Sequence, residues 1–342
     1  MAKKISKHRA KVLERQALAA ERMITLPERF EKVPVISWYP GHMLKAQREM
    51  REKMKLVDVI IELVDSRIPY TSMNPNFDPI FQDKPRLVLL NKSMLADKEE
   101  TAQWIKYYRS RGQRVLAVDA FKKRNLDKVL PEIRRIIDKA GKKKSFRLVT
   151  RCMIVGIPNV GKSTFINRMA GKKIANTGPT PGVTRHQQWV TLADDVELLD
   201  TPGVMFPRIE TKADELNLAL TAGIRDELVG EQITAEFLIY KLENAGLLYK
   251  IKGFDKYEGA DFSPEELLKK YGLFRGFLEA GGESDLHKTS TTLLHLFREG
   301  QLGRISLNTV KEVKEIARWE KKKRQEKRAA EKWVKPEDET NE

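Results

Sequence analysis

The chain has 342 residues, with 64 lysines and arginines against 48 aspartates and glutamates, for a formal net charge of +16. Such an excess favours a polyanionic partner, and no segment approaches the ~20 consecutive apolar residues that a membrane helix needs. The single cysteine, Cys152, excludes an internal disulfide and a cysteine-based metal site, which fits a reducing, cytoplasmic setting.

The first 34 residues are expected to form a basic N-terminal extension. They lack the apolar core of a signal peptide, and Glu14 and Glu21 argue against a mitochondrial presequence. Further basic clusters occur at Lys142–Lys144 and at Lys311–Lys335. A single charge run is ordinarily a solvated surface, but the three clusters together favour RNA over the rival partner, an anionic membrane.

Three apolar runs, Val57–Val64, Arg86–Leu90 and Val115–Val118, alternate with stretches of helical character such as Lys98–Arg111. This alternation predicts parallel strands of a doubly wound α/β sheet. Pro131–Ala140 is amphipathic and is expected to be the last helix of this half. We assign residues 35–206 to one α/β domain with a mostly parallel, six-stranded sheet.

A phosphate-binding loop follows. Arg151–Val155 reads as a strand, Gly156–Ser163 (Gly-Ile-Pro-Asn-Val-Gly-Lys-Ser) as the loop, and the residues after it as a helix. Backbone N–H groups of such a loop face the phosphates, Lys162 reaches the β- and γ-oxygens, and Ser163 ligates Mg²⁺. The predicted nucleotide-binding residues here are Asn159, Val160, Gly161, Lys162, Ser163 and Thr164.

Two further elements point to a nucleoside triphosphate. Thr177–Thr184 is too irregular for a helix or strand, which suits a switch loop whose Thr184 binds Mg²⁺ when a γ-phosphate is present. Val196–Asp200 is an apolar strand that runs into Asp200-Thr201-Pro202-Gly203. Asp200 is predicted to hold the metal through water, and the Gly203 N–H to contact the γ-phosphate.

The order of the elements is unusual, because Asn91-Lys92, a guanine-reading type of element, precedes the phosphate loop. This order resembles the circularly permuted GTPases of the ribosome biogenesis GTPase A (YlqF) family. The likeness runs from about Ser37 to about Asp226, and more weakly to about Leu307. It is carried by the permuted order and by four segments, Trp38–Met43, Asp65–Pro69, Gly156–Ser163 and Asp200–Gly203.

The resemblance implies a GTPase that binds GTP or GDP with Mg²⁺ and acts on a maturing large ribosomal subunit. It implies stimulation of hydrolysis by the ribosomal particle, and a helical C-terminal domain that contacts rRNA. No DNA and no membrane partner is expected, and the protein is predicted to be a monomer.

The guanine-reading motif departs from the family pattern. The family has Asn-Lys-x-Asp, whose carboxylate accepts two hydrogen bonds from guanine, whereas this chain has Met94 at the acidic position. Loss of that contact could weaken discrimination against adenine by ~10²-fold or more. Asp97 could bend back to replace it, and the last base-contacting element, Val118-Asp119-Ala120, lacks the usual serine. The residues alone indicate a purine triphosphate, and the resemblance favours GTP.

The residue that orients the attacking water is also unusual. Many GTPases place a glutamine directly after Asp-x-x-Gly, where this chain has Val204. By resemblance, His42 positions the water and Asn159 ligates a K⁺ that bridges the phosphates. The alternatives are a packing or surface role for His42 and a loop-geometry role for Asn159. The predicted catalytic residues are His42, Lys162, Thr184 and Gly203.

After Pro207 the apolar pattern changes to a 3.6-residue period. It predicts an all-helical, RNA-contacting domain over residues 207–308, with glycines such as Gly272 as helix stops. Residues 309–342 are predicted to be a basic tail in which Val310–Trp333 forms a long helix. The predicted helices of the domain are Ala213–Thr221, Ala235–Ala245, Pro264–Tyr271 and Thr289–Glu299.

The sequence therefore predicts a ribosome assembly GTPase whose nucleotide state controls docking and release. Because the chain leaves the sheet after Gly203 and enters the helical domain, an ordered γ-phosphate site could reposition that domain directly. The alternatives are a nucleotide-gated RNA-binding scaffold with little hydrolysis or relaxed purine specificity, and a small-substrate ATPase or kinase.

Overall fold

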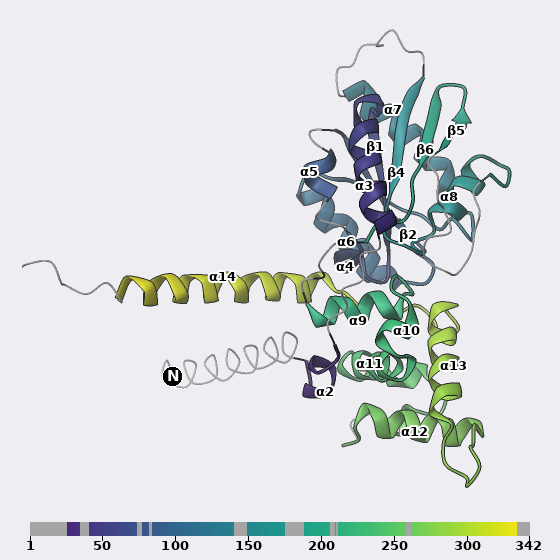
Figure 1. The fold of residues 1–342 in the computed structure, drawn as a ribbon, viewed down its shortest axis with the longest axis vertical. Helices are drawn as coiled ribbons and strands as arrows, with labels where there is room; N and C mark the ends of the chain where they lie inside the picture. The colour runs from purple at the N-terminus through teal and green to yellow at the C-terminus, as the bar shows by residue number, and fades with distance from the viewer. Residues whose placement is uncertain are drawn as a thin grey trace, which may run out of the picture.

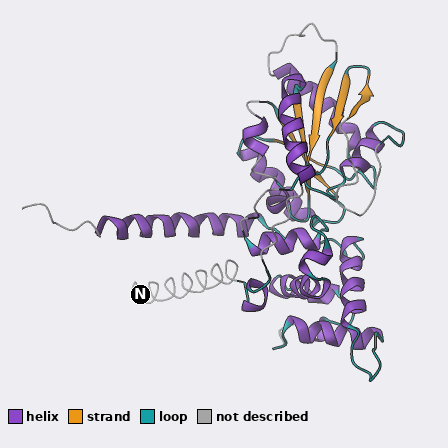
Figure 2. Ribbon diagram, viewed as in Figure 1, coloured by secondary structure: helices purple, strands orange, loops and turns teal. Residues whose placement is uncertain are grey.

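An α/β part and an all-helical part lie next to each other in the computed structural model, and a long C-terminal helix projects away from both (Figures 1 and 2). The structure describes residues 26–34, 41–73, 77–81, 84–139, 149–174, 188–205, 209, 211–257 and 261–333.

The α/β part is built on one sheet of six strands in the order β3-β2-β1-β4-β6-β5. Neighbouring strands are parallel except β5 and β6, which are antiparallel. The predicted doubly wound, mostly parallel sheet is confirmed. The strands are β1 (Val59–Asp65), β2 (Arg86–Asn91), β3 (Arg114–Ala117), β4 (Thr150–Val155), β5 (Gln188–Ala193) and β6 (Val196–Asp200).

Helices cover both faces of this sheet because successive side chains of a strand point to opposite sides. In β1, Leu63 belongs to the main apolar core, whereas Val64 packs in a second cluster around Trp104. The helices of this part are α3 (Gly41–Lys53), α4 (Pro69–Ser72), α5 (Asp78–Phe81), α6 (Lys98–Ser110), α7 (Val129–Lys139) and α8 (Lys162–Met169), with short 3₁₀ turns at Met54–Leu56 and Leu126–Lys128.

The helical part begins after β6, the last strand in chain order. Its elements are α9 (Lys212–Leu220), α10 (Asp226–Val229), α11 (Glu231–Asn244), α12 (Pro264–Arg275) and α13 (Leu286–Arg298), with 3₁₀ turns at Leu248–Lys250 and Asp255–Tyr257. The short N-terminal helix α2 (Glu28–Glu31) packs on α11, where the Phe30 ring lies 5.4 Å from the rings of Phe237 and Tyr240. The four-way domain division stays a prediction.

One predicted helix stop is wrong. Helix α12 continues through Gly272 and ends before Gly276, which has a left-handed φ of 68°. A Cβ atom at Gly272 would lie 1.8 Å from the Ser284 Oγ and 2.5 Å from the Thr289 Oγ1. Gly272 therefore permits close packing inside a helix and does not end one.

The predicted basic helix is confirmed as α14 (Val310–Trp333), which extends away from the body of the molecule (Figure 1). Its first turn is anchored, because Val310 and Val313 are buried in the cluster around Trp104 of α6. None of the helices in the described part of the chain is long and apolar enough to cross a bilayer.

Candidate nucleotide site

The phosphate loop lies between β4 and α8, as the motif requires. Gly161 has a φ of 99°, and a Cβ there would lie 2.6 Å from the Asn91 Nδ2. A Cβ at Gly203 would lie 2.9 Å from the Pro158 Cα and 3.0 Å from the Lys162 Nζ. Glycine at these two positions therefore permits a close approach of the loop to Asn91, Lys162 and the segment after β6 that a side chain would prevent, and the N-terminus of α8 suits phosphate oxygens.

Lys162 is held inside this loop. Its Nζ donates hydrogen bonds to the backbone oxygens of Gly156 and Ile157, at 3.0 and 2.9 Å. Burial lowers the pKa of Lys162 to about 8, although nearby Asp200 favours the charged form. An ammonium group in a desolvated loop binds a phosphate anion more strongly than the same group in water.

Asp200, which is predicted to hold Mg²⁺ through water, ends β6. Both of its carboxylate oxygens are buried and have no hydrogen-bond partner in the described residues. Burial raises the pKa of Asp200 to about 6, against the opposing effect of Lys162. A buried carboxylate with vacant lone pairs, together with Ser163 in the first turn of α8, fits Mg²⁺ and its water ligands. Thr184, the other residue predicted to bind Mg²⁺, lies outside the described residues.

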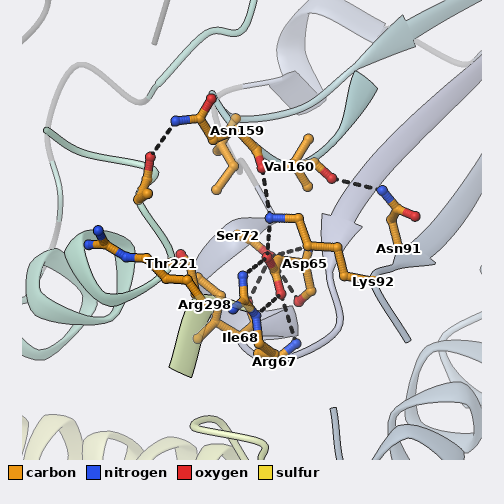
Figure 3. A network of polar contacts seen from close by, with 12 residues as sticks. Asp65, Arg67, Ile68, Ser72, Asn91, Lys92, Asn159, Val160, Thr221 and Arg298 are labelled. Atoms are coloured by element: carbon orange, nitrogen blue, oxygen red, sulfur yellow. Dashed lines mark hydrogen bonds and ion pairs between the residues drawn. The ribbon is translucent and has the colours of Figure 1, made fainter. Parts of the chain in front are cut away.

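Asn91 connects the base side of the site to the phosphate side. Its Nδ2 donates to the Val160 oxygen at 2.8 Å, and its Oδ1 accepts from the Ala120 N–H at 3.0 Å. The neighbouring Lys92 Nζ donates to the Asn159 oxygen at 2.7 Å. Figure 3 shows both contacts reaching the phosphate loop. The structure thus brings together Asn91, Lys92, Asn159 and Val160.

Asp65 belongs to the family-like segment Asp65–Pro69, but the sequence predicts no role for it in the site. It lies opposite Asn91 in the pairing of β1 with β2, and its carboxylate contacts Lys92 at 3.0 Å and Arg67 at 2.8 Å (Figure 3). Burial disfavours the charged carboxylate, yet Arg67 and Lys92 hold the pKa of Asp65 below its ordinary value. Asp65 therefore orients Lys92. The available signal was its place at the carboxyl end of a buried strand.

The acidic position of the base motif is filled by a methionine with structural contacts. The Arg124 Nη1 lies 2.8 Å from the Met94 Sδ, and the Met94 N–H donates to the Asp119 carboxylate at 3.2 Å. Asp97 does not replace the missing acid, because its Oδ1 caps α6 by accepting from Glu99 and Glu100 at 2.9 Å. The hypothesis that Asp97 bends back toward the base is wrong for this structure.

The two residues proposed for hydrolysis have different surroundings. His42 is the second residue of α3, and its side chain lies outside the described residues. The start of α3 lies beside the segment after Gly203, since the Met205 N–H donates to the Met43 Sδ at 3.5 Å. Asn159 has a left-handed φ of 56°, and its Nδ2 donates to the Ala222 oxygen at 2.8 Å. Its backbone thus agrees with the loop-geometry alternative, and both catalytic roles stay predictions.

Three features together define a circularly permuted phosphate-loop GTPase. They are the phosphate loop after β4, the buried Asp200 at the end of β6, and the base motif at the end of β2, which comes earlier in the chain. Residues 151–269 match the family of 50S ribosome-binding GTPases. The chain is 40% identical to ribosome biogenesis GTPase A of Bacillus cereus over 288 residues, which cover 82% of this chain and 96% of that protein. It is 31% identical to ribosome biogenesis GTPase A of Thermotoga maritima over 278 residues (81% and 96%).

Solved structures of this family are also similar to the chain. The GDP-bound and GNP-bound structures of YlqF from T. maritima are both 26% identical to the chain, with TM-scores of 0.55 and 0.54. The matched region spans 77% and 78% of this chain, and 100% and 98% of the two YlqF chains. The chain belongs to the ribosome biogenesis GTPase A family. It is a GTP-hydrolysing enzyme that binds guanine nucleotide.

Proposed function

We propose that this GTPase assists assembly of the large ribosomal subunit, docking on precursor particles with GTP bound and leaving after hydrolysis. Relatives named ribosome biogenesis GTPase A support the ribosomal role. The observation that carries the gating is the contact between the phosphate loop and the helical part, Asn159 to Ala222, at 2.8 Å. A change at the phosphates therefore has a direct route to the helices.

The partner surface follows from charge. The net charge of +16 and the basic helix α14, which is anchored at its first turns, suit the phosphate backbone of rRNA. We also propose that the protein is a monomer, that it is located in the cytoplasm, and that it binds neither DNA nor a membrane.

Nucleotide roles are assigned residue by residue. Lys162 contacts the β- and γ-phosphates, Gly203 donates its N–H to the γ-phosphate, and Asn159, Val160, Gly161 and Thr164 line the phosphate loop. Ser163, Asp200 and Thr184 would hold Mg²⁺, which would neutralise charge on the β- and γ-phosphates. Asn159 would also ligate a K⁺. Replacing K⁺ by Na⁺ in the hydrolysis assay tests this role, because the rate should then fall.

Stimulation by the particle tests the proposal. Multiple-turnover GTP hydrolysis is expected to rise at least ~10-fold when precursor or mature large subunits are added, because the particle completes an active site that lacks a glutamine. Small subunits are the control and should give no rise. Equal rates with and without large subunits would favour the alternative, a nucleotide-gated scaffold with little hydrolysis. ATP competing equally with GTP would show that Met94 has relaxed the purine specificity.

His42 can be tested in the same assay. We expect His42→Ala to lower particle-stimulated turnover by about 10²-fold, because an imidazole that positions water contributes on that scale. The affinity for GTP should stay near that of the wild type, since His42 touches water and not the nucleotide. Unchanged stimulated turnover would remove His42 from the mechanism.

A further inference from the structure

The segment between α13 and α14 lies against the loop that follows the base motif. We call residues 304–309 the strap and residues 93–97 the base loop. The Arg304 guanidinium donates to the Ser93 oxygen at 2.8 Å and to the Ala96 oxygen at 2.6 Å. The Ile305 N–H donates to the Leu95 oxygen at 2.9 Å, and the Asp97 N–H donates to the Ser306 Oγ at 3.1 Å. The strap thus contacts most of the base loop by hydrogen bonds.

The two Arg304 hydrogen bonds are partly buried, and the residues that accept them are almost fully buried, so water cannot easily replace the guanidinium as donor. Ser93 is 5% exposed, and Ala96 and Ile305 are exposed by 1% or less. A buried carbonyl that loses a charged donor keeps the whole desolvation penalty. Within the base loop itself, the Ser93 N–H is already bonded to the Val118 oxygen and the Leu95 N–H to the Lys92 oxygen. These N–H groups therefore cannot serve the Ser93 and Ala96 oxygens, for which Arg304 is the donor, and Arg304 adds to the contacts that hold the base loop.

The other end of the strap is fixed to the turn after β1 and to α6. The Leu307 and Asn308 N–H groups donate to the Arg67 oxygen, at 2.8 and 3.3 Å. The Trp104 Nε1 donates to the Asn308 oxygen at 3.1 Å, and the Val310 N–H donates to the Glu100 carboxylate at 2.6 Å. The strap is consequently held on both sides, with α6 and the start of α14 in contact (Figure 1).

The base loop continues directly into the nucleotide site. It follows Asn91 and Lys92, which hold the phosphate loop through Val160 and Asn159 (Figure 3). In this chain Met94 supplies no carboxylate, so recognition of the base depends more on where the loop holds its remaining groups. Arg304, which is more than 200 positions away from Ser93 in the sequence, can therefore affect the affinity for nucleotide by holding the base loop in place.

We propose that Arg304 is a positioning residue for the purine base: by bonding the Ser93 and Ala96 oxygens from the far side, it holds the base loop in its nucleotide-binding conformation. This role concerns the free enzyme and is independent of ribosomal docking. It makes the strap, which lies at the end of the helical part, a component of base recognition.

The experiment compares ligands with and without a base. In Arg304→Ala, the affinity for GTP and the KM for GTP should each worsen about 10-fold or more, the scale of a lost charge-assisted hydrogen-bond pair. The affinity for inorganic triphosphate, measured by competition, should change less than twofold, and kcat at saturating GTP should be retained. Arg304→Lys should restore part of the GTP affinity, because an ammonium group replaces one of the two donors.

Arg298→Ala is the matched control. Its guanidinium also donates to two backbone oxygens, those of Ala219 and Leu220, and pairs with Asp226, but it does not touch the base loop. Its ratio of GTP to triphosphate affinity should equal that of the wild type. Ser306→Ala, which removes only the acceptor of the Asp97 N–H, is the variant that decides if Arg304→Ala does not fold. It should lower the same ratio two- to threefold. An unchanged ratio in Arg304→Ala, or in Ser306→Ala where the former is unfolded, would overturn the proposal.

Discussion

Replacing Lys162 by alanine is expected to lower multiple-turnover GTP hydrolysis by at least ~10²–10³-fold without lowering the thermal stability of the nucleotide-free protein. The ammonium group is the predicted electrostatic partner of the phosphate oxygens, and losing such a group removes several kcal/mol of transition-state stabilisation. Without nucleotide the same charge is buried and its hydrogen bonds go to backbone oxygens, and burial lowers its pKa to about 8 against the opposing effect of nearby Asp200. A buried charge that is poorly compensated destabilises the fold.

Hydrolysis assays and scanning calorimetry of the nucleotide-free protein measure the two effects. Lys172→Ala, at an exposed lysine shortly after α8, is the matched control and should change neither quantity. Turnover of Lys162→Ala within tenfold of the wild type would contradict the role of Lys162. A large fall in its melting temperature would contradict the stability argument alone.

Replacing Asp65 by asparagine is expected to lower the free energy of unfolding by about 3–5 kcal/mol, the range for breaking a buried ion pair from one side. Asp65 is 1% exposed and Arg67 is 2% exposed, so the guanidinium would lose its carboxylate without gaining water. The Arg67 Nη1 already lacks a partner within the described residues. Lys92 would lose the group that orients it, so the affinity for GTP should fall as well.

Urea denaturation measures the first effect and nucleotide titration the second. Asp195→Asn provides a control with the same substitution in an exposed ion pair, since Asp195 and Arg134 have side chains that are 45% and 47% exposed. That variant should cost less than ~1 kcal/mol. Similar losses for Asp65→Asn and Asp195→Asn would show that the buried network does not hold the site.

The parts of the site that could be predicted from sequence are those made by contiguous residues. The phosphate loop combines a strand, two glycines and a helix start within one short segment, so its geometry follows locally. Strands β1, β2 and β4 are buried on both faces and therefore appear as continuous apolar runs. Strand β5 was not recognised, because it is an edge strand with exposed Gln188 and Thr191 and lacks such a run.

The parts that could not be predicted depend on register and on distant contacts. The pairing of Asp65 with Lys92 requires the alignment of β1 with β2, which hydrophobic patterns do not specify. Glycine commonly ends a helix, so the sequence predicts a helix stop at Gly272. Its actual role is close packing against Ser284, a contact that depends on the tertiary structure and cannot be predicted from the local sequence. The contact of Arg304 with Ser93 joins residues that are 211 positions apart in the sequence, and no local pattern indicates it.

The most direct test of nucleotide-controlled docking is the equilibrium affinity of the purified protein for large-subunit precursors. It should be measured by sedimentation at fixed salt, once with a non-hydrolysable GTP analogue and once with GDP, because RNA affinity depends strongly on salt. We expect the analogue-bound protein to bind at least ~10-fold more tightly, since a coupling of this size is typical of ligand-controlled states. Equal affinity in the two nucleotide states would contradict the proposed gating.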